Sequence, residues 1–460
     1  MYGIYGSSRL VKILPVLGYP FVPLWRSQLI SFIMKYGTHV ATKYPTCLRR
    51  QPRQHWEGGL VQPLSRYGAT IDSEVGECVG MRWQSAVVIQ QSPAMADGRR
   101  RTSSGATNKS VSGEDGCDSV SSPRYAILDC DGGSDDAWAL LLLLHARKTH
   151  NIQLLAITTV GCGNTNRENS ARNMRRILIA SKRTEIPIYL GAVDPLIPSC
   201  EDEKKYFHGR DGFGDCLEDD GEPVECFVQP EHAVPAIHAL CQARPNQITI
   251  FAVGPLTNLA LGYTMYGEQF GNNFRDIFIM GGNYQGVGNS SRAAEFNFHS
   301  DPEAAHTVLL KSRCPITILP WEPCLPEKFN IPIDWRLKEF GERAKEANHP
   351  AITMLNQVEA AQWLPMIEQY GINTWNPCDA IVVAVWLFEE RILCKHSTWH
   401  AAVDLRGTHT RGQMVLDHLR EREKYPENVR IIELVDAEFF KRICEWVAGL
   451  DDGIIVEGTQ

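Results

Sequence analysis

From residue 125 onward, short runs of apolar residues alternate with segments whose apolar residues recur at helical spacing. The apolar runs predict buried strands at 125–128, Leu154–Thr159, Ile186–Leu190, Ile248–Val253, Ile277–Met280 and Ile316–Leu319. Helical spacing predicts helices at Asn169–Ser181, His232–Arg244 and Pro302–Lys311, and a further helix that begins at Gly254-Pro255 with the proline in its first turn. Strands that are apolar throughout and alternate with helices indicate a parallel sheet covered on both faces.

The rest of the pattern continues this architecture. The segment Trp335–Glu390 is mainly helical in pattern, and the C-terminal part predicts a few strands closed by a helix at Ala437–Ala448. We therefore expect an α/β fold, with an open, mostly parallel Rossmann-like sheet and helices on both faces. Folds of this kind bind ligands at the carboxyl edge of the strands, so we expect the functional site there.

Residues 1–122 differ in composition from the rest. Residues 1–56 carry eight basic residues and no acidic one, and a Ser/Gly/Asp-rich run ends at Ser122. An acid-free, Arg-containing start resembles a mitochondrial transit peptide; the alternative is an untargeted upstream extension, with translation beginning at Met95. We expect an N-terminal extension over 1–122, largely disordered or a targeting segment, and a folded domain over 123–460.

Composition excludes some classes of function. The formal net charge of −8 argues against a nucleic-acid-binding protein, because such proteins present a basic face. No apolar run reaches the roughly 18 residues that span a bilayer, so we expect no membrane partner. Fourteen cysteines, none in a C-x-x-C pair, favour free thiols in a reducing compartment. We expect a cytoplasmic location, with the mitochondrion as the alternative if the basic N-terminus is a transit peptide.

Four carboxylates stand in one turn between a predicted strand and a strongly apolar helical run: Asp129, Asp131, Asp135 and Asp136. An Asp pair at a helix start can serve only as a cap. Four crowded acids with two glycines among them instead favour a bound cation, and hard oxygen ligands favour Ca²⁺ or Mg²⁺. The sequence therefore predicts a metal site at this edge of the sheet.

Polar residues also follow the other predicted strands and should meet the acidic turn at the same edge. They comprise Asn164, Asn258, Asn283, Asn289, Glu295, Asn297 and Asp379. Amide and carboxylate groups in this number suit a polyhydroxylated ligand that is held by hydrogen bonds next to a hard cation.

These motifs resemble a known family. The pattern Asp129-x-Asp131-x-Gly133-x-Asp135-Asp136 is similar to the signature of the nucleoside hydrolases, the inosine-uridine preferring nucleoside N-ribohydrolases. The family's later motifs are matched in the same order by Ala156–Val160 with Asn164, Gly254–Asn258, Met280–Gly282, Ala294–Asn297 and Asp301–Ala304. The resemblance covers roughly residues 123–450. It implies a catalytic domain that hydrolyses the N-glycosidic bond of ribonucleosides to free base and ribose, in nucleoside catabolism or salvage.

The resemblance also implies residue roles. A Ca²⁺ ion would be held by Asp131, Asp136, the main-chain carbonyl of Val253, and Asp379, with the ribose 2′- and 3′-hydroxyls completing its shell. Sugar hydroxyls would be bound by Asp135, Asn164, Asn289, Glu295 and Asn297, with Met280 along the ribose and Asp129 in support. The loop His208–Gly214 resembles the family's mobile loop over the base. A homodimer or homotetramer is implied as well.

These residues suggest how the attacking water is activated and how the sugar is held. Asp131 can be both a metal ligand and the general base for the attacking water. Glu295 and the asparagines hold the sugar, and their negative potential favours cationic character at C1′.

The leaving-group side departs from the family pattern. Cys378 stands where many members have the histidine that protonates the departing base. Its thiol could donate a proton or only pack, and His208 or water are alternative acids. Trp375 or Tyr370 could stack on a purine.

Two other interpretations remain open from the sequence. A phosphotransferase of the haloacid-dehalogenase type also has Asp-x-Asp after a strand, but Gly133 stands where that class has Thr or Val. A nucleoside- or ribose-binding protein of the same fold that lost turnover would account for Cys378. The presence of Asp131 argues against it, since a pure binder has less need of a general base.

Overall fold

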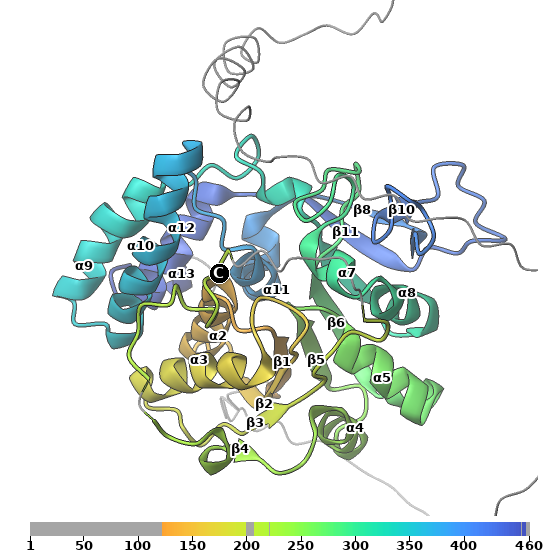
Figure 1. Cartoon of the computed structure of the whole chain (residues 1–460), viewed down its shortest axis with the longest axis horizontal. Coiled ribbons are helices and arrows are strands. Elements are labelled where there is room, and N and C mark those ends of the chain that lie inside the picture. Colours follow the sequence, from red (N-terminus) through yellow and green to blue (C-terminus); the bar gives the residue numbers. More distant parts are fainter. Residues whose placement is uncertain (1–121, 199–206, 220, 452, 457–460) are drawn as a thin grey trace, which may run out of the picture. The chain divides into compact units, whose positions relative to one another are not determined.

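The computed structural model describes residues 122–198, 207–219, 221–451 and 453–456. Within them a nine-stranded sheet runs in the order β4-β3-β2-β1-β5-β6-β7-β11-β8 (Figure 1). Its strands are β1 (Arg124–Cys130), β2 (Ile152–Thr159), β3 (Ile188–Leu190), β4 (Val228–Gln229), β5 (Ile248–Ala252), β6 (Phe274–Met280), β7 (Ile316–Leu319), β8 (Leu393–Trp399) and β11 (Val429–Val435). Every pairing is parallel except that of β8 with β11, which confirms the predicted, mostly parallel α/β sheet.

Strand β1 lies at the centre of the sheet, between β2 and β5. Its residue Ile127 pairs with Ala156 on one side and with Ile250 on the other. Successive side chains of a strand point to opposite faces. Accordingly, Ala126 and Leu128 belong to one apolar core and Ile127 to a second. The sheet is therefore buried on both faces, as its continuous apolar strands predict.

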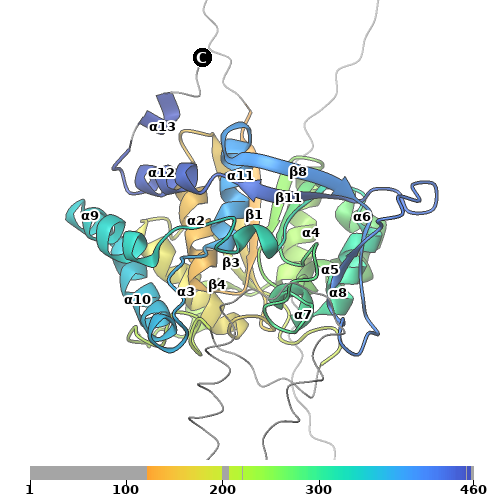
Figure 2. The ribbon, with the colours of Figure 1, turned by 90° about the horizontal axis from the view of Figure 1, so that it is seen from above.

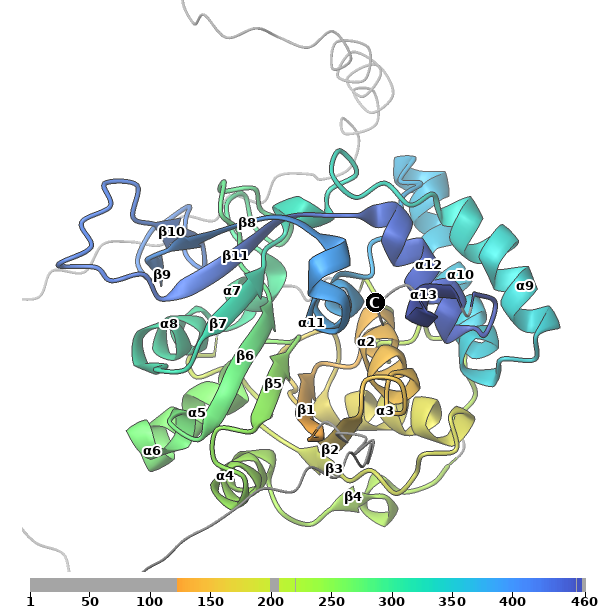
Figure 3. The ribbon, with the colours of Figure 1, turned by 180° about the vertical axis from the view of Figure 1, so that it is seen from behind.

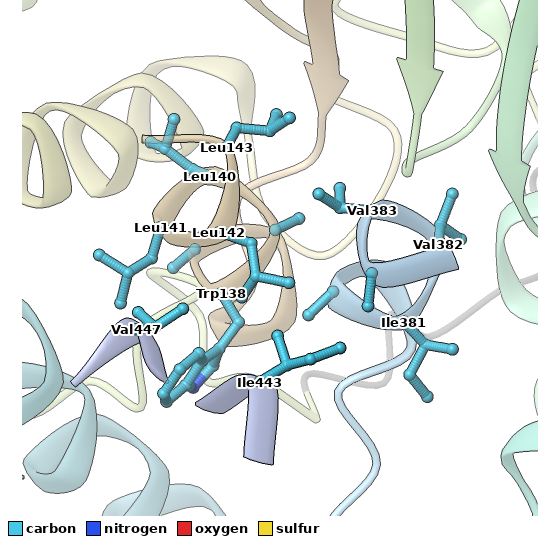
Figure 4. Packing of buried hydrophobic residues seen from close by; sticks show 14 of the residues in the cluster. Trp138, Leu140, Leu141, Leu142, Leu143, Ile381, Val382, Val383, Ile443 and Val447 are labelled. Atoms are coloured by element: carbon cyan, nitrogen blue, oxygen red, sulfur yellow. The ribbon is translucent and has the colours of Figure 1, made fainter. Parts of the chain in front are cut away.

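Helices cover both faces (Figure 3). On the face of the first core lie α2 (Ser134–His145), α3 (Arg167–Ala180), α11 (Cys378–Ile392) and α12 (Ala437–Val447). On the other face lie α4 (Ala233–Ala243), α5 (Thr257–Tyr266), α6 (Glu268–Gly271) and α8 (Pro302–Lys311). Figure 4 shows Leu140–Leu143 of α2 beside Ile381–Val383 of α11, with Ile443 and Val447 of α12 also next to α2. This two-sided burial explains why the leucine run of α2 lacks a polar stripe.

The remaining elements pack onto the edges of these two cores. A 3₁₀ turn covers Val224–Cys226, and another covers Glu322–Cys324. A π-helical segment (Trp335–Phe340) leads into α9 (Gly341–Glu346), and α10 (Pro350–Tyr370) lies beside α2 (Figures 1 and 2). The hairpin of β9 (Ala401–Val403) and β10 (Met414–Leu416) is antiparallel, and the short helices are α7 (Phe296–Ser300) and α13 (Gly453–Val456).

One boundary differs from the prediction. Helix α5 begins at Thr257, with Leu256 before it, so Pro255 lies outside the helix rather than in its first turn. Gly254 is held against the acidic turn, where an added Cβ would lie 3.0 Å from Cβ of Asp131. The chain therefore passes the acidic turn before helix α5 begins.

The structure describes only part of the chain to which two sequence predictions apply. The extension at 1–121, with its targeting alternatives, lies outside them. The ten cysteines that the structure describes are all free thiols, as expected. None of the helices described is both long and apolar enough to cross a membrane.

Candidate active site

The acidic turn joins the end of β1 to the start of α2 at the carboxyl edge of the sheet. Gly132 has a φ of 83°, and an added Cβ there would overlap Ser170, so the turn requires glycine. Asp136 accepts hydrogen bonds from the backbone N–H of Asp131 at 3.1 Å and of Gly133 at 2.7 Å. It thus caps the helix from inside its first turn while remaining next to Asp131.

Asn164, in the loop after β2, holds Asp131. Its backbone N–H donates to Oδ2 of Asp131 at 2.8 Å, and its side-chain amide donates to Oδ1 at 2.9 Å. An added Cβ at Gly163 would overlap the same carboxylate. The orientation of Asp131 is therefore fixed by the neighbouring loop, and Gly163 is a site residue that the sequence analysis did not single out.

Three carboxylates converge beside Asp131. Oxygen atoms of Asp135, Asp136 and Asp379 all lie within 4.8 Å of one another. The first two lie in the first turn of α2 and the third in the first turn of α11, where the helix dipoles favour negative charge. Oδ1 of Asp135 is buried and has no hydrogen-bond partner. Converging oxygen ligands with an unpartnered buried oxygen suit a hard cation.

Burial makes the charged form of this cluster unfavourable. It raises the pKa of Asp131 to about 7, and it raises the pKa of Asp136 well above the ordinary value, with the nearby Asp131 and Asp135 adding to the effect. Burial, followed by the charge of Asp135, likewise raises the pKa of Asp379 well above its ordinary value. A bound cation would offset this repulsion.

The main-chain carbonyl of Val253, just after β5, is oriented by Asn297. The side-chain amide of Asn297 donates to the carbonyl oxygens of Val253 at 3.0 Å and Met280 at 3.1 Å. This bonding brings the ends of β5 and β6 together with α7. Three residues that the resemblance placed at one site are therefore adjacent.

Glu295 precedes α7 and is 1% exposed. Its carboxylate accepts hydrogen bonds from the backbone N–H of Gly282 (2.6 Å), Asn297 (2.7 Å) and Phe298 (3.1 Å). Burial raises the pKa of Glu295 to about 7. The structure thus gives Glu295 a clear part in holding the loop after β6, and its contact with a sugar remains a prediction.

Asp129, near the end of β1, stabilises the start of the acidic turn through hydrogen bonds to its neighbours. Its Oδ1 accepts hydrogen bonds from the hydroxyl of Thr158 at 2.5 Å and the amide of Asn258 at 2.7 Å. Asn258 in turn accepts from the backbone N–H of Ala192 at 2.8 Å. Burial raises the pKa of Asp129 to about 6. These bonds join the ends of β1 and β2 to the start of α5 and the loop after β3.

His208 lies over the start of α2. Its Nδ1 is 3.3 Å from both the backbone N and the hydroxyl of Ser134, and its Nε2 is 3.5 Å from Oδ1 of Asp135. The hydroxyl of Ser134 also donates to Gln362 of α10 at 2.9 Å. Burial lowers the pKa of His208, so the imidazole is neutral at pH 7. The predicted loop residue is therefore beside the acid cluster.

Cys378 is the first residue of α11 and is buried, with its thiol 3.7 Å from the carbonyl oxygen of Asn376. The neighbouring Cys324 thiol and burial hold the pKa of Cys378 well above its ordinary value. The thiol therefore keeps its proton at neutral pH.

The structure tests the remaining sequence candidates unequally. Trp375 is 1% exposed and its indole N–H donates to Glu359 at 2.8 Å, so the expectation that it could stack on a purine is wrong. Tyr370 is exposed at the end of α10. Asn289 is exposed in the loop after β6, so its role in the site remains a prediction.

Comparisons with known proteins identify the family of the chain. The family model of the inosine-uridine preferring nucleoside hydrolases matches residues 126–442. The chain is 30% identical over 328 residues to the pyrimidine-specific ribonucleoside hydrolase RihA of Photobacterium profundum, covering 69% of this chain and 96% of that protein. It is 29% identical over 334 residues to the inosine-uridine preferring nucleoside hydrolase of Leishmania major, covering 72% and 98%.

Solved structures show the same likeness. An inosine-guanosine nucleoside hydrolase superposes with a TM-score of 0.61 at 26% identity, over 71% of this chain and 99% of that one. A purine-preferring ribonucleoside hydrolase from Gardnerella vaginalis, at 22% identity and a TM-score of 0.60, shares the fold over 71% of this chain and 98% of its own.

Proposed function

The chain belongs to the inosine-uridine preferring nucleoside hydrolase family and hydrolyses the N-glycosidic bond of ribonucleosides, and we propose that this reaction depends on Ca²⁺ and on a water activated by Asp131. The single observation that carries the proposal is the convergence of the Asp135, Asp136 and Asp379 carboxylates beside Asp131. Membership of the family removes the phosphotransferase from consideration, and the ribose-release test distinguishes the hydrolase from a binding protein of the same fold that lost turnover.

The donor set supports Ca²⁺ as the cation. Asp131, Asp136, Asp379 and the Val253 carbonyl are hard oxygen ligands from three separate segments, and such irregular oxygen sets suit Ca²⁺ better than the strict octahedron of Mg²⁺. Asp135, whose buried Oδ1 makes no hydrogen bond, is close enough to join them. When bound, the cation would supply positive charge that offsets the acids and holds the ribose 2′- and 3′-hydroxyls.

Asp131 is the residue best placed to take a proton from the attacking water. Its carboxylate is held by two hydrogen bonds from Asn164, and each oxygen retains a further lone pair for a water molecule. A general base must be within hydrogen-bond reach of the water and correctly oriented, and the Asn164 bonds supply that orientation.

The sugar would be held by the polar groups around this carboxylate. We assign Asp135, Asn164, Asn289, Glu295 and Asn297 to its hydroxyls and Met280 to the ring face. The acids on the water side would stabilise positive charge that develops at C1′ as the bond breaks.

On the leaving-group side, Cys378 adjoins the cluster at the start of α11 and carries a protonated thiol. We assign it to donation of a proton to the departing base. His208, whose Nε2 is 3.5 Å from Oδ1 of Asp135, is the alternative donor; because burial lowers its pKa and leaves the ring neutral at pH 7, we prefer Cys378. Named relatives differ in preference between pyrimidine and purine nucleosides, so the base is left to experiment.

The test is ribose release by the purified full chain from inosine, adenosine, guanosine, uridine and cytidine, with Ca²⁺ and after removal of metal by chelator. We expect release from at least one nucleoside, its loss in chelator and its return with added Ca²⁺. Unchanged release in chelator would overturn the metal assignment, and no release from any nucleoside with Ca²⁺ would overturn the proposal as a whole.

A further inference from the structure

A fully buried ion pair lies next to α2 and the segment before α11. Arg336, in the π-helical segment before α9, is 0% exposed, and Glu359 of α10 is 1% exposed. Nη2 of Arg336 is 2.5 Å from Oε2 of Glu359. Removing two charges from water costs more than a simple apolar pair would, so stability alone does not account for this arrangement.

The other oxygen of Glu359 joins two tryptophans. Its Oε1 accepts the indole N–H of Trp375 at 2.8 Å and that of Trp138 at 3.2 Å. The two indole rings meet edge to face with centroids 5.5 Å apart. One carboxylate oxygen thus fixes two large side chains relative to each other.

Arg336 completes the cluster from the opposite side. Its guanidinium carbon lies 4.9 Å from the ring centroid of Trp138 and 5.3 Å from that of Trp375. Its Nη1 donates to the side chain of Asn356 at 2.5 Å. Cation–π contact and the ion pair together hold the charge of Glu359 in an apolar setting.

The two tryptophans belong to the segments that carry the acids. Trp138 is in the second turn of α2, just after Asp135 and Asp136, and Trp375 precedes α11, which brings Asp379. The three carboxylates at the starts of these two helices, Asp135, Asp136 and Asp379, repel one another. A rigid link between the segments resists that repulsion and keeps the oxygen atoms within reach of one cation.

We propose that Glu359, with Arg336 as its counter-charge, is a positioning residue that fixes the start of α2 against the segment before α11 and thereby sets the affinity of the Asp135–Asp136–Asp379 cluster for Ca²⁺. The inference deepens the proposed function and rests on it. Neither side chain touches the substrate or the cation; each acts through Trp138 and Trp375.

A matched pair of double variants separates the effect of the hydrogen bonds between Glu359 and the two indoles from the effect of the buried charges. Arg336→Met with Glu359→Gln removes both charges and keeps a carbonyl oxygen that accepts from both indoles. Arg336→Met with Glu359→Leu removes the same charges and also the acceptor. The two variants have side chains of similar volume at position 359 and differ there in one hydrogen-bonding group. Because both remove the charges of Arg336 and Glu359 together, neither leaves an unpaired buried charge that would prevent folding. Arg343→Met with Glu445→Gln, at an ion pair between α9 and α12, is the control.

The measurement is the Kd for Ca²⁺ by calorimetry on metal-free full-length protein, with the unfolding temperature recorded alongside. We expect the Gln double variant to bind Ca²⁺ like the control and the Leu double variant to bind about 10- to 100-fold more weakly, the usual cost of losing a group that orients a ligand. Excess Ca²⁺ should restore much of the ribose release of the Leu variant.

Two results would overturn the inference, and they are distinguishable. If wild type binds Ca²⁺ but the Gln and Leu double variants bind it equally, the pair serves packing alone, whatever happens to the unfolding temperature. If wild type itself binds no Ca²⁺, the metal assignment of the proposed function is wrong and this inference fails with it.

Discussion

Asp131 is held by hydrogen bonds at both its backbone and its carboxylate. Its backbone N–H donates to Asp136, and its carboxylate receives both donors of Asn164. We expect Asp131→Asn to lower kcat by about 10²- to 10⁴-fold, as loss of a general base does, while part of the nucleoside binding remains. Ribose release and calorimetric binding measure the two effects, and near-normal turnover would show that Asp131 is not the base.

Gly163 gives a steric test of the same carboxylate. A Cβ there would overlap Oδ2 of Asp131, so Gly163→Ala should displace the carboxylate and reduce kcat by at least about tenfold, because small misplacements of reacting groups are costly. Gly371→Ala is the comparison. Its φ of 68° strains any other residue, but nothing lies near its Cβ, so stability should fall while kcat does not. Equal kcat in both variants would contradict the geometry.

Cys378 tests the leaving-group side. Its thiol is protonated but a weak acid, because Cys324 and burial hold its pKa high. We expect Cys378→Ala to lower kcat by about tenfold, less than the usual 10²- to 10⁴-fold because the thiol is a weak acid, and Cys378→His to restore or exceed the wild-type rate. Rates on one purine and one pyrimidine nucleoside measure the effect. No change in Cys378→Ala on either would leave the thiol a packing group.

The helices around His150 give the fold a pH dependence that is separate from the acid cluster. This ring lies edge-on to Phe388 of α11 and Trp446 of α12, with centroid distances of 4.8 and 5.8 Å. Burial, then the charges of Arg124 and His145, lower its pKa to about 4. The hydroxyl of Thr149 lies 3.0 Å from its Nδ1.

The sign of that dependence follows from proton uptake. Unfolded His150 titrates near pH 6.5 and the folded residue near 4, so the unfolded state gains protons first as the pH falls. Stability is therefore lost between these values and is unaffected above pH 6.5. We expect the free energy of unfolding of His150→Phe to increase relative to that of wild type as the pH is lowered from 7.5 to 5. Urea titration at each pH measures both. A constant difference across that range would contradict this explanation.

Elements whose pattern is local were predictable from sequence. Helix α8 and strand β7 have the predicted bounds, and the acids before the leucine run marked the start of α2. The start of α5 was not, because it depends on Gly254 packing against Asp131 from another strand. The Arg336–Glu359 pair was not predictable either. Trp138, which donates to Glu359, is 221 residues away in the sequence, and nothing in the local pattern joins them.

Across the whole chain, the family match over residues 126–442 coincides with the region whose strands and helices alternate. We therefore keep residues 123–460 as the proposed catalytic domain, and a homodimer or homotetramer as the expected assembly. Parallel strands bring their carboxyl ends to one edge, which is why the sequence could group Asp131, Val253 and Met280. Only packing could show how closely Asp379 approaches Asp135 and Asp136, or that Trp375 is buried.

Ribose release across a Ca²⁺ titration of metal-free full-length protein, with bound Ca²⁺ measured in the same samples, is the decisive experiment. Activity should rise in proportion to one tightly bound Ca²⁺ per chain, and Asp379→Asn should shift both curves together to higher Ca²⁺. Full ribose release before any Ca²⁺ is bound would contradict a cation-dependent site at the start of α2 and α11.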